Sequence, residues 1–136
     1  MSDFSFPVRV YYEDTDAGGV VYHANYLRFM ERARTEWLRQ LGFTQRDLRE
    51  RQKVLFVVRG VQIDYRRPAL FDDELRVDSD VESASRTALR FHQRILRPAD
   101  DSLICDAEVG IVCVDADAFR PIAIPDAIRD RIQPAE

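Results

Sequence analysis

The fold is decided by one stretch of sequence, residues 25–42, which reads NYLRFMERARTEWLRQLG. Apolar residues recur in it at spacings of three and four: Leu27, Met30, Ala33, Trp37 and Leu41. This period places one apolar stripe along an α-helix of about four to five turns. Asn25 is a suitable N-cap residue for that helix, and Gly42 is a suitable residue to end it.

The sequence on either side of this helix is patterned as strands. Upstream, a period-two alternation predicts a half-buried first strand with Phe6, Val8, Val10 and Tyr12 on one face. Downstream, four runs predict strands over residues 54–67, 74–83, 87–97 and 103–115, with Gly60 as a bulge in the first of them.

Two shorter helices complete the predicted elements. Thr44 followed by Asp47 resembles a weak capping box, which predicts a second helix that ends near Gln52. Pro125 followed by Asp126 predicts a final short helix through Ile132. The order is therefore strand, long helix, short helix and four strands, before the final helix.

One long amphipathic helix needs a sheet to cover its apolar stripe, and short connections favour antiparallel strands. We therefore predict an α+β hotdog fold, in which a curved antiparallel sheet wraps around a central long helix. A chain of 136 residues is enough for one domain, residues 1–136. Because an open sheet leaves edge strands, we expect edges to pair between two subunits.

Composition excludes several functional classes. The 20 basic and 24 acidic residues give a net charge of −4, which argues against a nucleic-acid partner. Only Lys53 is a lysine and the other basic residues are arginine. Codon bias and recognition of phosphate or carboxylate by arginine both remain open as explanations. The longest aliphatic or aromatic run, residues 54–58, is far too short to span a bilayer.

The two cysteines indicate a reducing environment. Cys105 and Cys113 lie in one predicted strand, roughly 26 Å apart at about 3.3 Å per residue, so they cannot pair. The first residues, Met1 to Phe4, carry an acidic residue where a secretory signal carries basic ones. We therefore expect a reduced protein in the cytoplasm.

The densest group of reactive side chains lies between the first strand and the long helix: Tyr12, Glu13, Asp14, Asp16 and His23, with Gly18 and Gly19 among them. A partly buried carboxylate with acidic neighbours is a candidate general base. Two glycines let backbone approach a ligand closely, and the free N–H groups of a helix start stabilise an oxyanion. Hydrolysis of an activated acyl group needs this combination, although a solvated acidic turn before a helix remains the alternative. The sequence carries no metal or cofactor motif, which favours cofactor-free chemistry.

Residues 8–26, which read VRVYYEDTDAGGVVYHANY, resemble the Tol-Pal system-associated acyl-CoA thioesterases (YbgC type). These belong to the 4-hydroxybenzoyl-CoA thioesterase group of hotdog proteins. The resemblance continues through residues 31–36, 56–59, 65–69, 72–73 and 108–115, and so covers nearly the whole chain. It implies that Asp16 is the catalytic carboxylate, with His23 and Tyr12 as further catalytic residues. It also implies that the thioester carbonyl sits against a backbone amide at or next to His23. Asp16 either attacks the carbonyl or deprotonates water.

The same resemblance implies an enzyme without a cofactor or metal that hydrolyses acyl-CoA, or the equivalent thioester on acyl carrier protein. It points to a homodimer that pairs again into a homotetramer. Coenzyme A carries phosphates, so arginines on strand segments are candidates to bind it: Arg59, Arg66, Arg67, Arg90 and Arg94.

Two other functions are open for this fold. One is a binding or scaffold protein for acyl carrier protein or for lipid-synthesis enzymes linked to the Tol-Pal envelope system. The other is a hydratase or dehydratase, which is disfavoured by the order of Asp16 and His23 with a Gly-Gly turn between them.

Overall fold

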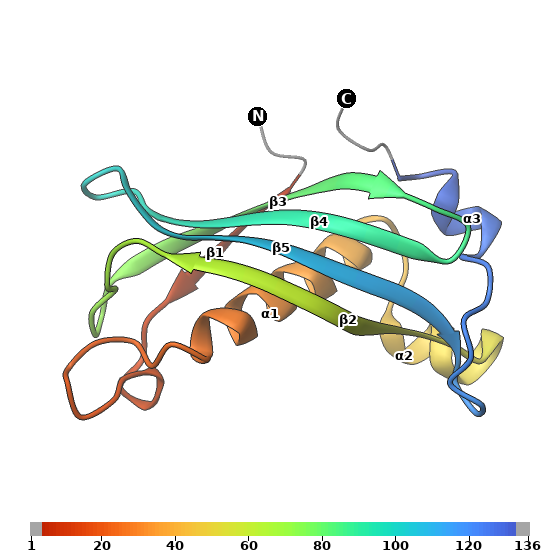
Figure 1. The fold of residues 1–136 in the computed structure, drawn as a ribbon, viewed down its shortest axis with the longest axis horizontal. Helices are drawn as coiled ribbons and strands as arrows, with labels where there is room; N and C mark the ends of the chain where they lie inside the picture. The colour runs from red at the N-terminus through yellow and green to blue at the C-terminus, as the bar shows by residue number, and fades with distance from the viewer. Residues whose placement is uncertain (1–3, 133–136) are drawn as a thin grey trace.

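A five-stranded antiparallel sheet curves around one long helix in the computed structural model, which describes residues 4–132 (Figure 1). This arrangement confirms the predicted hotdog architecture. The outermost parts of the predicted domain, residues 1–3 and 133–136, lie outside the described residues. The elements in chain order are β1 (Phe4–Arg9), α1 (Asn25–Gln40), α2 (Gln45–Asp47), β2 (Val54–Tyr65), β3 (Glu74–Ala84), β4 (Ala88–Arg97), β5 (Ser102–Asp115) and α3 (Asp126–Arg129).

The sheet order is β1-β3-β4-β5-β2, with every neighbouring pair antiparallel. β1 and β2 therefore form the two edges of the sheet, and the helices connect them along the chain. The register of β2 against β5 shifts between Val58 and Gly60, which confirms the predicted bulge. The bounds of β2 to β5 differ from the predicted ones by one or two residues.

Helix α1 lies against the concave face of the sheet and fills it (Figure 1). Phe29, Met30 and Ala33 are fully buried there, and the Trp37 ring meets the Phe91 ring of β4 edge-on at 5.0 Å between centroids. The buried face is broader than the predicted stripe, because Tyr26 and Leu38 are also buried. A wider face follows from the sheet curving around the helix, which covers it from more than one side.

The first strand is shorter than predicted. It ends at Arg9, and Tyr12 lies in a single 3-10 turn, Tyr12–Asp14, with its side chain 81% exposed. The prediction that Tyr12 continues the strand is wrong, because the backbone before it bonds to a side chain of the turn and not to a neighbouring strand. The N–H group of Tyr11 donates to the Asp14 carboxylate at 2.8 Å, which turns the chain out of the sheet.

The predicted N-cap of α1 is also wrong. Ala24 occupies the N-cap position with no capping side chain, and Asn25 is the first helical residue. The Asn25 side-chain amide instead donates to the Asp14 carboxylate at 2.8 Å, so the side chain bonds to the acidic residue and not to the helix backbone. The C-terminal prediction is confirmed, since Gly42 follows the helix with a φ of 101°, a left-handed value that suits glycine.

The two short helices follow their predicted signals. Thr44 caps α2, with its hydroxyl accepting from the Asp47 N–H group at 3.1 Å, and a π-helical turn, Leu48–Gln52, continues the segment to Gln52 as predicted. Helix α3 begins after Pro125 but ends at Arg129, earlier than the predicted Ile132. Ile128 of α3 is fully buried and so contributes to the core.

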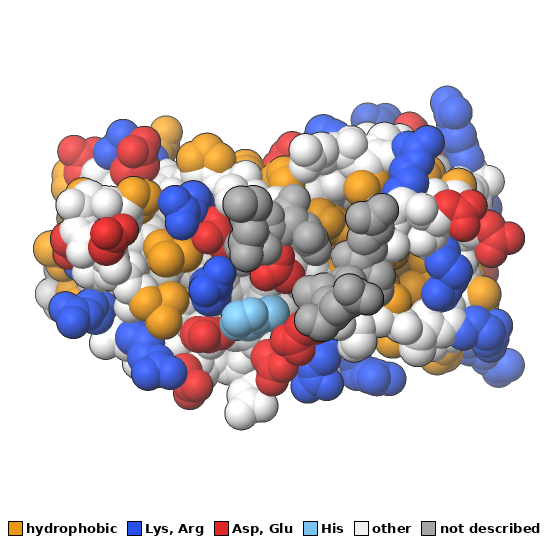
Figure 2. All heavy atoms as spheres, turned by 90° about the horizontal axis from the view of Figure 1, so that it is seen from above, with side chains coloured by type: hydrophobic (Ala, Val, Ile, Leu, Met, Phe, Trp, Pro, Cys, Tyr) orange, Lys and Arg blue, Asp and Glu red, His pale blue; other side chains and the backbone are white. Residues whose placement is uncertain are grey.

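The outer face of the sheet carries charges of both signs. His92 Nε2 of β4 lies 2.6 Å from Asp106 Oδ1 of β5, and Arg90 Nε lies 3.6 Å from Glu108 Oε1. Seen from above, acidic and basic side chains intermingle around a histidine (Figure 2). Among residues 4–132, no helix combines the length and the apolar character needed to cross a membrane.

Candidate active site

The acidic turn, which we define as residues 11–23, connects β1 to α1. A bridge between Thr15 and Val21 closes its central part, and the Asp16 carbonyl accepts from the Gly19 N–H group at 3.0 Å. The Asp16 side chain is exposed, and its Oδ1 accepts from the Gly18 N–H group at 2.8 Å. The carboxylate is therefore held in an exposed position within the turn by one of its two oxygens.

Both glycines suit this geometry, for different reasons. Gly19 has a φ of 82°, in the left-handed region that disfavours side chains. A Cβ atom on Gly18 would stand 3.2 Å from Asp16 Oδ1, which is tighter than ordinary van der Waals contact. The glycine pair thus shapes the backbone and leaves room for the Asp16 carboxylate.

Asp14, not Asp16, is the buried carboxylate of the acidic turn. It is 4% exposed, and its two oxygens accept from the Tyr11 N–H group and from the Asn25 amide. Its carbonyl also accepts from the Tyr22 N–H group at 2.9 Å. Asp14 therefore holds the turn against the first turn of α1, a role that the spacing of the carboxylates did not reveal.

His23 stands directly before α1. Its carbonyl accepts a 3.0 Å hydrogen bond from the Tyr65 hydroxyl at the end of β2. Its exposed ring lies 4.6 Å from the Tyr22 ring and 6.3 Å from the Tyr65 ring, between centroids. Within residues 4–132 the structure gives the backbone N–H groups of His23 and Ala24 no backbone acceptor, as expected at the positive end of a helix dipole.

Tyr12 is separate from this arrangement. Its ring packs edge-on against Phe71 at 6.2 Å between centroids, on the exposed side of the turn. Its hydroxyl has no hydrogen bond among the described residues. Tyr12, Asp16 and His23 thus belong to one turn, in which the Tyr12 ring contacts Phe71.

A second loop, residues 66–73, supports the acidic turn from the side. The Val21 N–H group donates to the Ala69 carbonyl at 2.9 Å, and Val20 forms a bridge with Leu70. The Ala69 N–H group donates in turn to the Tyr26 hydroxyl of α1 at 3.1 Å. These contacts join the turn, the loop and the helix start into one unit.

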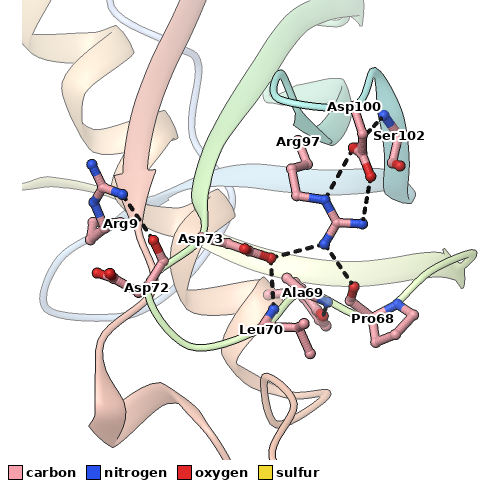
Figure 3. Close-up of polar contacts among 10 residues, drawn as sticks. Arg9, Pro68, Ala69, Leu70, Asp72, Asp73, Arg97, Asp100 and Ser102 are labelled. Carbon is pink, nitrogen blue, oxygen red and sulfur yellow. Dashed lines mark hydrogen bonds and ion pairs between the residues drawn. The ribbon is translucent and has the colours of Figure 1, made fainter.

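Arg97 at the end of β4 fixes this loop (Figure 3). Its guanidinium donates to Asp73 at 2.8 Å and to the Pro68 carbonyl at 3.2 Å, and Asp73 also accepts from the Leu70 N–H group at 2.8 Å. Two further hydrogen bonds of 3.1 Å run from Arg97 to Asp100 and lower the pKa of that carboxyl to about 2. Sequence reasoning missed Arg97, because nothing in its neighbourhood distinguishes it from other strand arginines.

Two tyrosines lie beside the helix start, Tyr26 buried and Tyr65 exposed, and a tyrosine hydroxyl is ordinarily neutral at physiological pH. Desolvation raises the pKa of Tyr26 and, together with the nearby Cys105, the pKa of Tyr65. Both hydroxyls therefore stay neutral at physiological pH and can donate hydrogen bonds. Tyr65 is thereby suited to hold the His23 carbonyl in place.

The five arginines predicted to bind coenzyme A do not form one patch. Arg59 and Arg90 line an open groove of about 600 Å³ with Gly60 and Gly110. Arg66 and Arg67 follow β2 directly after Tyr65, are exposed, and have no ion pair among the described residues. Arg94 on β4 is half-buried and stands opposite Asp78 and Asp106 in the sheet.

One apolar cavity of about 180 Å³ lies between the second half of α1 and the sheet. Its lining residues are Glu31, Arg34, Trp37, Leu38, Gln45, Phe56, Val58, Leu89, Phe91 and Ile111. Among residues 4–132, no group of three or more His, Cys, Asp and Glu side chains is arranged to hold a metal ion.

Comparison with known proteins gives consistent results. The sequence profile described as the Thioesterase-like superfamily matches residues 10–132. The chain is 50% identical over 126 residues to an "Acyl-CoA thioesterase YbgC" of Haemophilus influenzae, which covers 93% of this chain and 91% of the relative. It is 34% identical to an "Acyl-CoA thioesterase YbgC" of Helicobacter pylori, covering 90% and 94% of the two chains. A solved structure of a probable thioesterase from Bartonella henselae superimposes with a TM-score of 0.84 at 36% identity, covering 89% and 98%.

A curved antiparallel sheet around one helix is the hotdog fold, and the matched family and relatives are thioesterases. The chain belongs to the Thioesterase-like superfamily. It is thus an enzyme that hydrolyses thioesters.

Proposed function

We propose that this protein hydrolyses the thioester of acyl-CoA to a free acid and coenzyme A, with Asp16 as the catalytic carboxylate. The observation that carries the proposal is the exposed Asp16 carboxylate, held by Gly18 in the same turn that ends at the free amides of the α1 start. The relatives named acyl-CoA thioesterases, at up to 50% identity, support the substrate class.

The thioester carbonyl oxygen accepts hydrogen bonds from the backbone N–H groups at His23 and Ala24. These amides and the helix dipole stabilise the negative charge that develops on the oxygen as the carbonyl is attacked. Tyr65 holds the His23 carbonyl, and so keeps this peptide in position.

Asp16 acts in one of two ways. As a general base, it takes a proton from water, the hydroxide adds to the carbonyl, and the C–S bond breaks to leave the thiolate of coenzyme A, which is then protonated. As a nucleophile, it displaces the thiolate to form an anhydride that water then opens. In a single turnover in ¹⁸O-labelled water, label in Asp16 establishes the nucleophilic route, because water that attacks the Asp16 carbonyl of the anhydride leaves its oxygen there, whereas the general-base route places the label only in the product acid.

The test of the catalytic assignment is Asp16→Asn, which keeps the shape and removes the basic oxygen. We expect a loss of kcat of at least a hundredfold on every acyl-CoA that the wild type cleaves, with the melting temperature unchanged. Asp117→Asn, an exposed aspartate of the loop after β5, is the matched control. Wild-type turnover by the Asp16 variant on all substrates would overturn the assignment.

Kinetic constants distinguish the proposed contributions of His23 and Tyr12 to the reaction. Because the proposed role of His23 is carried by its backbone, we expect His23→Gln to reduce kcat less than Asp16→Asn does. Tyr12 is exposed on the outer side of the turn. We therefore propose that it contacts bound substrate rather than Asp16, so Tyr12→Phe should change KM more than kcat.

We further propose that Arg66 and Arg67 bind phosphates of coenzyme A, since both are exposed, free of ion pairs among the described residues, and next to Tyr65. Arg66→Ala and Arg67→Ala should each raise KM for acyl-CoA and leave KM unchanged for the matching N-acetylcysteamine thioester, which lacks the phosphates. Arg59, Arg90 and Arg94 are tested in the same way. An assay with the matching acyl thioester on the phosphopantetheine of acyl carrier protein shows whether that protein is an alternative substrate.

We propose a homodimer that pairs the β2 edges of two chains, with dimers associating further into a tetramer. β2 is the longer of the two edge strands, and its Val58 and Val61 side chains are 49% and 41% exposed. An antiparallel pair centred near Gly60 would bring the Tyr65 end of one strand to the Val54 end of the other. Val61→Lys should shift the mass measured by light scattering towards the monomer, whereas Leu70→Lys outside β2 should not.

We expect the protein to reside in the cytoplasm, because Cys105 and Cys113 are free thiols in the structure. A scaffold role remains the competing outcome. It would be supported by negligible hydrolysis of acyl-CoA at every chain length together with stoichiometric capture of acyl carrier protein.

A further inference from the structure

Arg34 is a cation placed between α1 and the sheet. It is half-buried, and its Nη1 donates to Gln93 Oε1 of β4 at 2.8 Å. Burial lowers the pKa of Arg34 to about 10, so the guanidinium remains charged at neutral pH. Among residues 4–132 no carboxylate forms an ion pair with it.

Gln93 holds this guanidinium in one orientation. Its side chain is fully buried, and its amide nitrogen donates to the Met30 carbonyl at 3.0 Å and to the Ser79 hydroxyl at 2.9 Å. These two bonds fix which end of the amide faces Arg34, so that the oxygen must accept from it. The arginine is therefore built into the core by a network that leaves most of its five N–H donors unused.

Arg34 lines the apolar cavity together with Trp37. Its walls are aromatic and aliphatic, with Phe56 and Phe91 on the sheet side. The other charged group of the lining, Glu31, is exposed and accepts from the Thr35 hydroxyl at 2.7 Å; its charge favours the charged form of Arg34, but the two side chains form no ion pair. A partly desolvated cation without an ion pair is costly, and an oxygen acceptor brought by a ligand reduces that cost.

The size of the cavity limits what can occupy it. A cavity of roughly 150 Å³ with apolar walls holds a benzene molecule. The volume of about 180 Å³ here thus suits one ring or a short chain, with space for a few further atoms.

We propose that this cavity receives the distal part of the acyl group, and that Arg34 selects compact acyl groups that end in an oxygen acceptor. A terminal carboxylate is preferred to a terminal hydroxyl. The proposal rests on the proposed acyl-CoA hydrolysis. It rests also on the proposed pairing of two β2 edges near Gly60, which would bring the Tyr65 end of one strand, where the acidic turn is bound, to the end of the other strand that carries Phe56. The cavity then serves the thioester bound by the other chain.

Three six-carbon thioesters test the selection: hexanoyl-CoA, 6-hydroxyhexanoyl-CoA and 5-carboxypentanoyl-CoA. For the wild type we expect kcat/KM to be at least tenfold higher for the carboxylate than for hexanoyl-CoA, with the hydroxyl between them. In Arg34→Met this ratio should fall to about one or below. The control Arg32→Met, an exposed arginine of the same helix outside the cavity, should keep the wild-type ratio.

A wild type that prefers hexanoyl-CoA, or a folded Arg34→Met that keeps the wild-type ratio, overturns the proposal. If Arg34→Met does not fold, Arg34→Lys, which retains a charge but not the fork of donors, should show a ratio between one and that of the wild type.

The proposed hydrolysis can fail separately. If the wild type cleaves none of the three thioesters, that failure concerns the acyl-CoA activity. Calorimetric binding of 5-carboxypentanoyl-CoA and hexanoyl-CoA then still decides the selection, since the carboxylate should bind tenfold more tightly to the wild type and equally to Arg34→Met.

Discussion

The amide of Asn25 donates a 2.8 Å hydrogen bond to the buried carboxylate of Asp14, which joins the acidic turn to the first residue of α1. This contact sets where Asp16 lies relative to the free amides of the helix start. Asp16, the carboxylate proposed to be catalytic, is exposed, while Asp14 two residues earlier is buried and serves as a structural acceptor.

Breaking this contact should reduce both stability and activity. In Asn25→Ala, one Asp14 oxygen loses its partner while buried, so we expect the free energy of unfolding to fall by about 1 to 3 kcal/mol. We expect kcat to fall as well, because Asp16 is no longer held against α1. Urea unfolding and steady-state kinetics measure the two effects. Asp130→Asn, an exposed residue after α3, should change neither, and an Asn25 variant as stable as the wild type would contradict this role.

The two glycines of the acidic turn should respond differently to alanine. Gly18→Ala places a Cβ against Asp16 Oδ1, so we expect kcat to drop with little change in stability. Gly19→Ala forces an alanine to a φ of 82°, which should cost about 1 to 2 kcal/mol of stability. Gly110→Ala in β5, where the new Cβ meets only ordinary contacts, is the control. Equal effects of the Gly18 and Gly19 substitutions on stability would argue against this division.

Arg97 should stabilise the protein in a pH-dependent way. Its hydrogen bonds to Asp100 lower the pKa of that carboxyl to about 2 from an ordinary value of 3.8. A carboxyl with a lowered pKa contributes stability above its ordinary pKa and loses that contribution as the pH falls towards the lowered value. Arg97→Met should therefore be less stable than the wild type at neutral pH, with a difference that shrinks between about pH 4 and pH 2. Thermal melts of both proteins across this range measure it.

The size of the neutral-pH difference follows from Asp73. Its carboxylate and the Arg97 guanidinium are only 22% and 16% exposed, so losing this charge-assisted bond should cost about 1.5 to 3 kcal/mol. Arg120→Met, on the exposed loop after β5, should behave as the wild type at every pH. A stability difference that stays constant down to pH 2 would show that Asp100 does not contribute.

The two thiols should be inert in the folded protein. Burial raises the pKa of Cys105 to about 12 and that of Cys113 to about 11, and both side chains are buried. Since the thiolate is the reactive form, neither cysteine should react with a thiol reagent at pH 8 until the chain unfolds. The rate of labelling should follow the fraction unfolded in urea. Rapid reaction of either thiol without denaturant would contradict the packing of β5.

Local patterns predicted most of the fold. The spacing of Met30, Ala33 and Trp37 predicted α1, because apolar residues three and four positions apart lie on one face of a helix, and the sheet buries that face. Gly42 and Gly60 marked a helix end and a bulge: Gly42 has a left-handed φ that other residues rarely adopt, and the register of β2 against β5 shifts at Gly60. The predicted first strand was too long, because the alternating pattern to Tyr12 contains no sign that the Tyr11 N–H group donates to Asp14.

The sequence by itself determined the hotdog architecture and the stretch that carries Asp16 and His23, since periodicity, turn residues and a contiguous motif all act over short distances. The tertiary structure decided which carboxylate is buried, how Arg97 and Asp73 hold the loop beside the acidic turn, and that Arg34 meets Gln93 beneath α1. Arg97 and Asp73 are 24 residues apart, and Arg34 and Gln93 are 59 apart. Contacts between residues so distant depend on how the sheet curves around the helix, and no local pattern encodes that curvature.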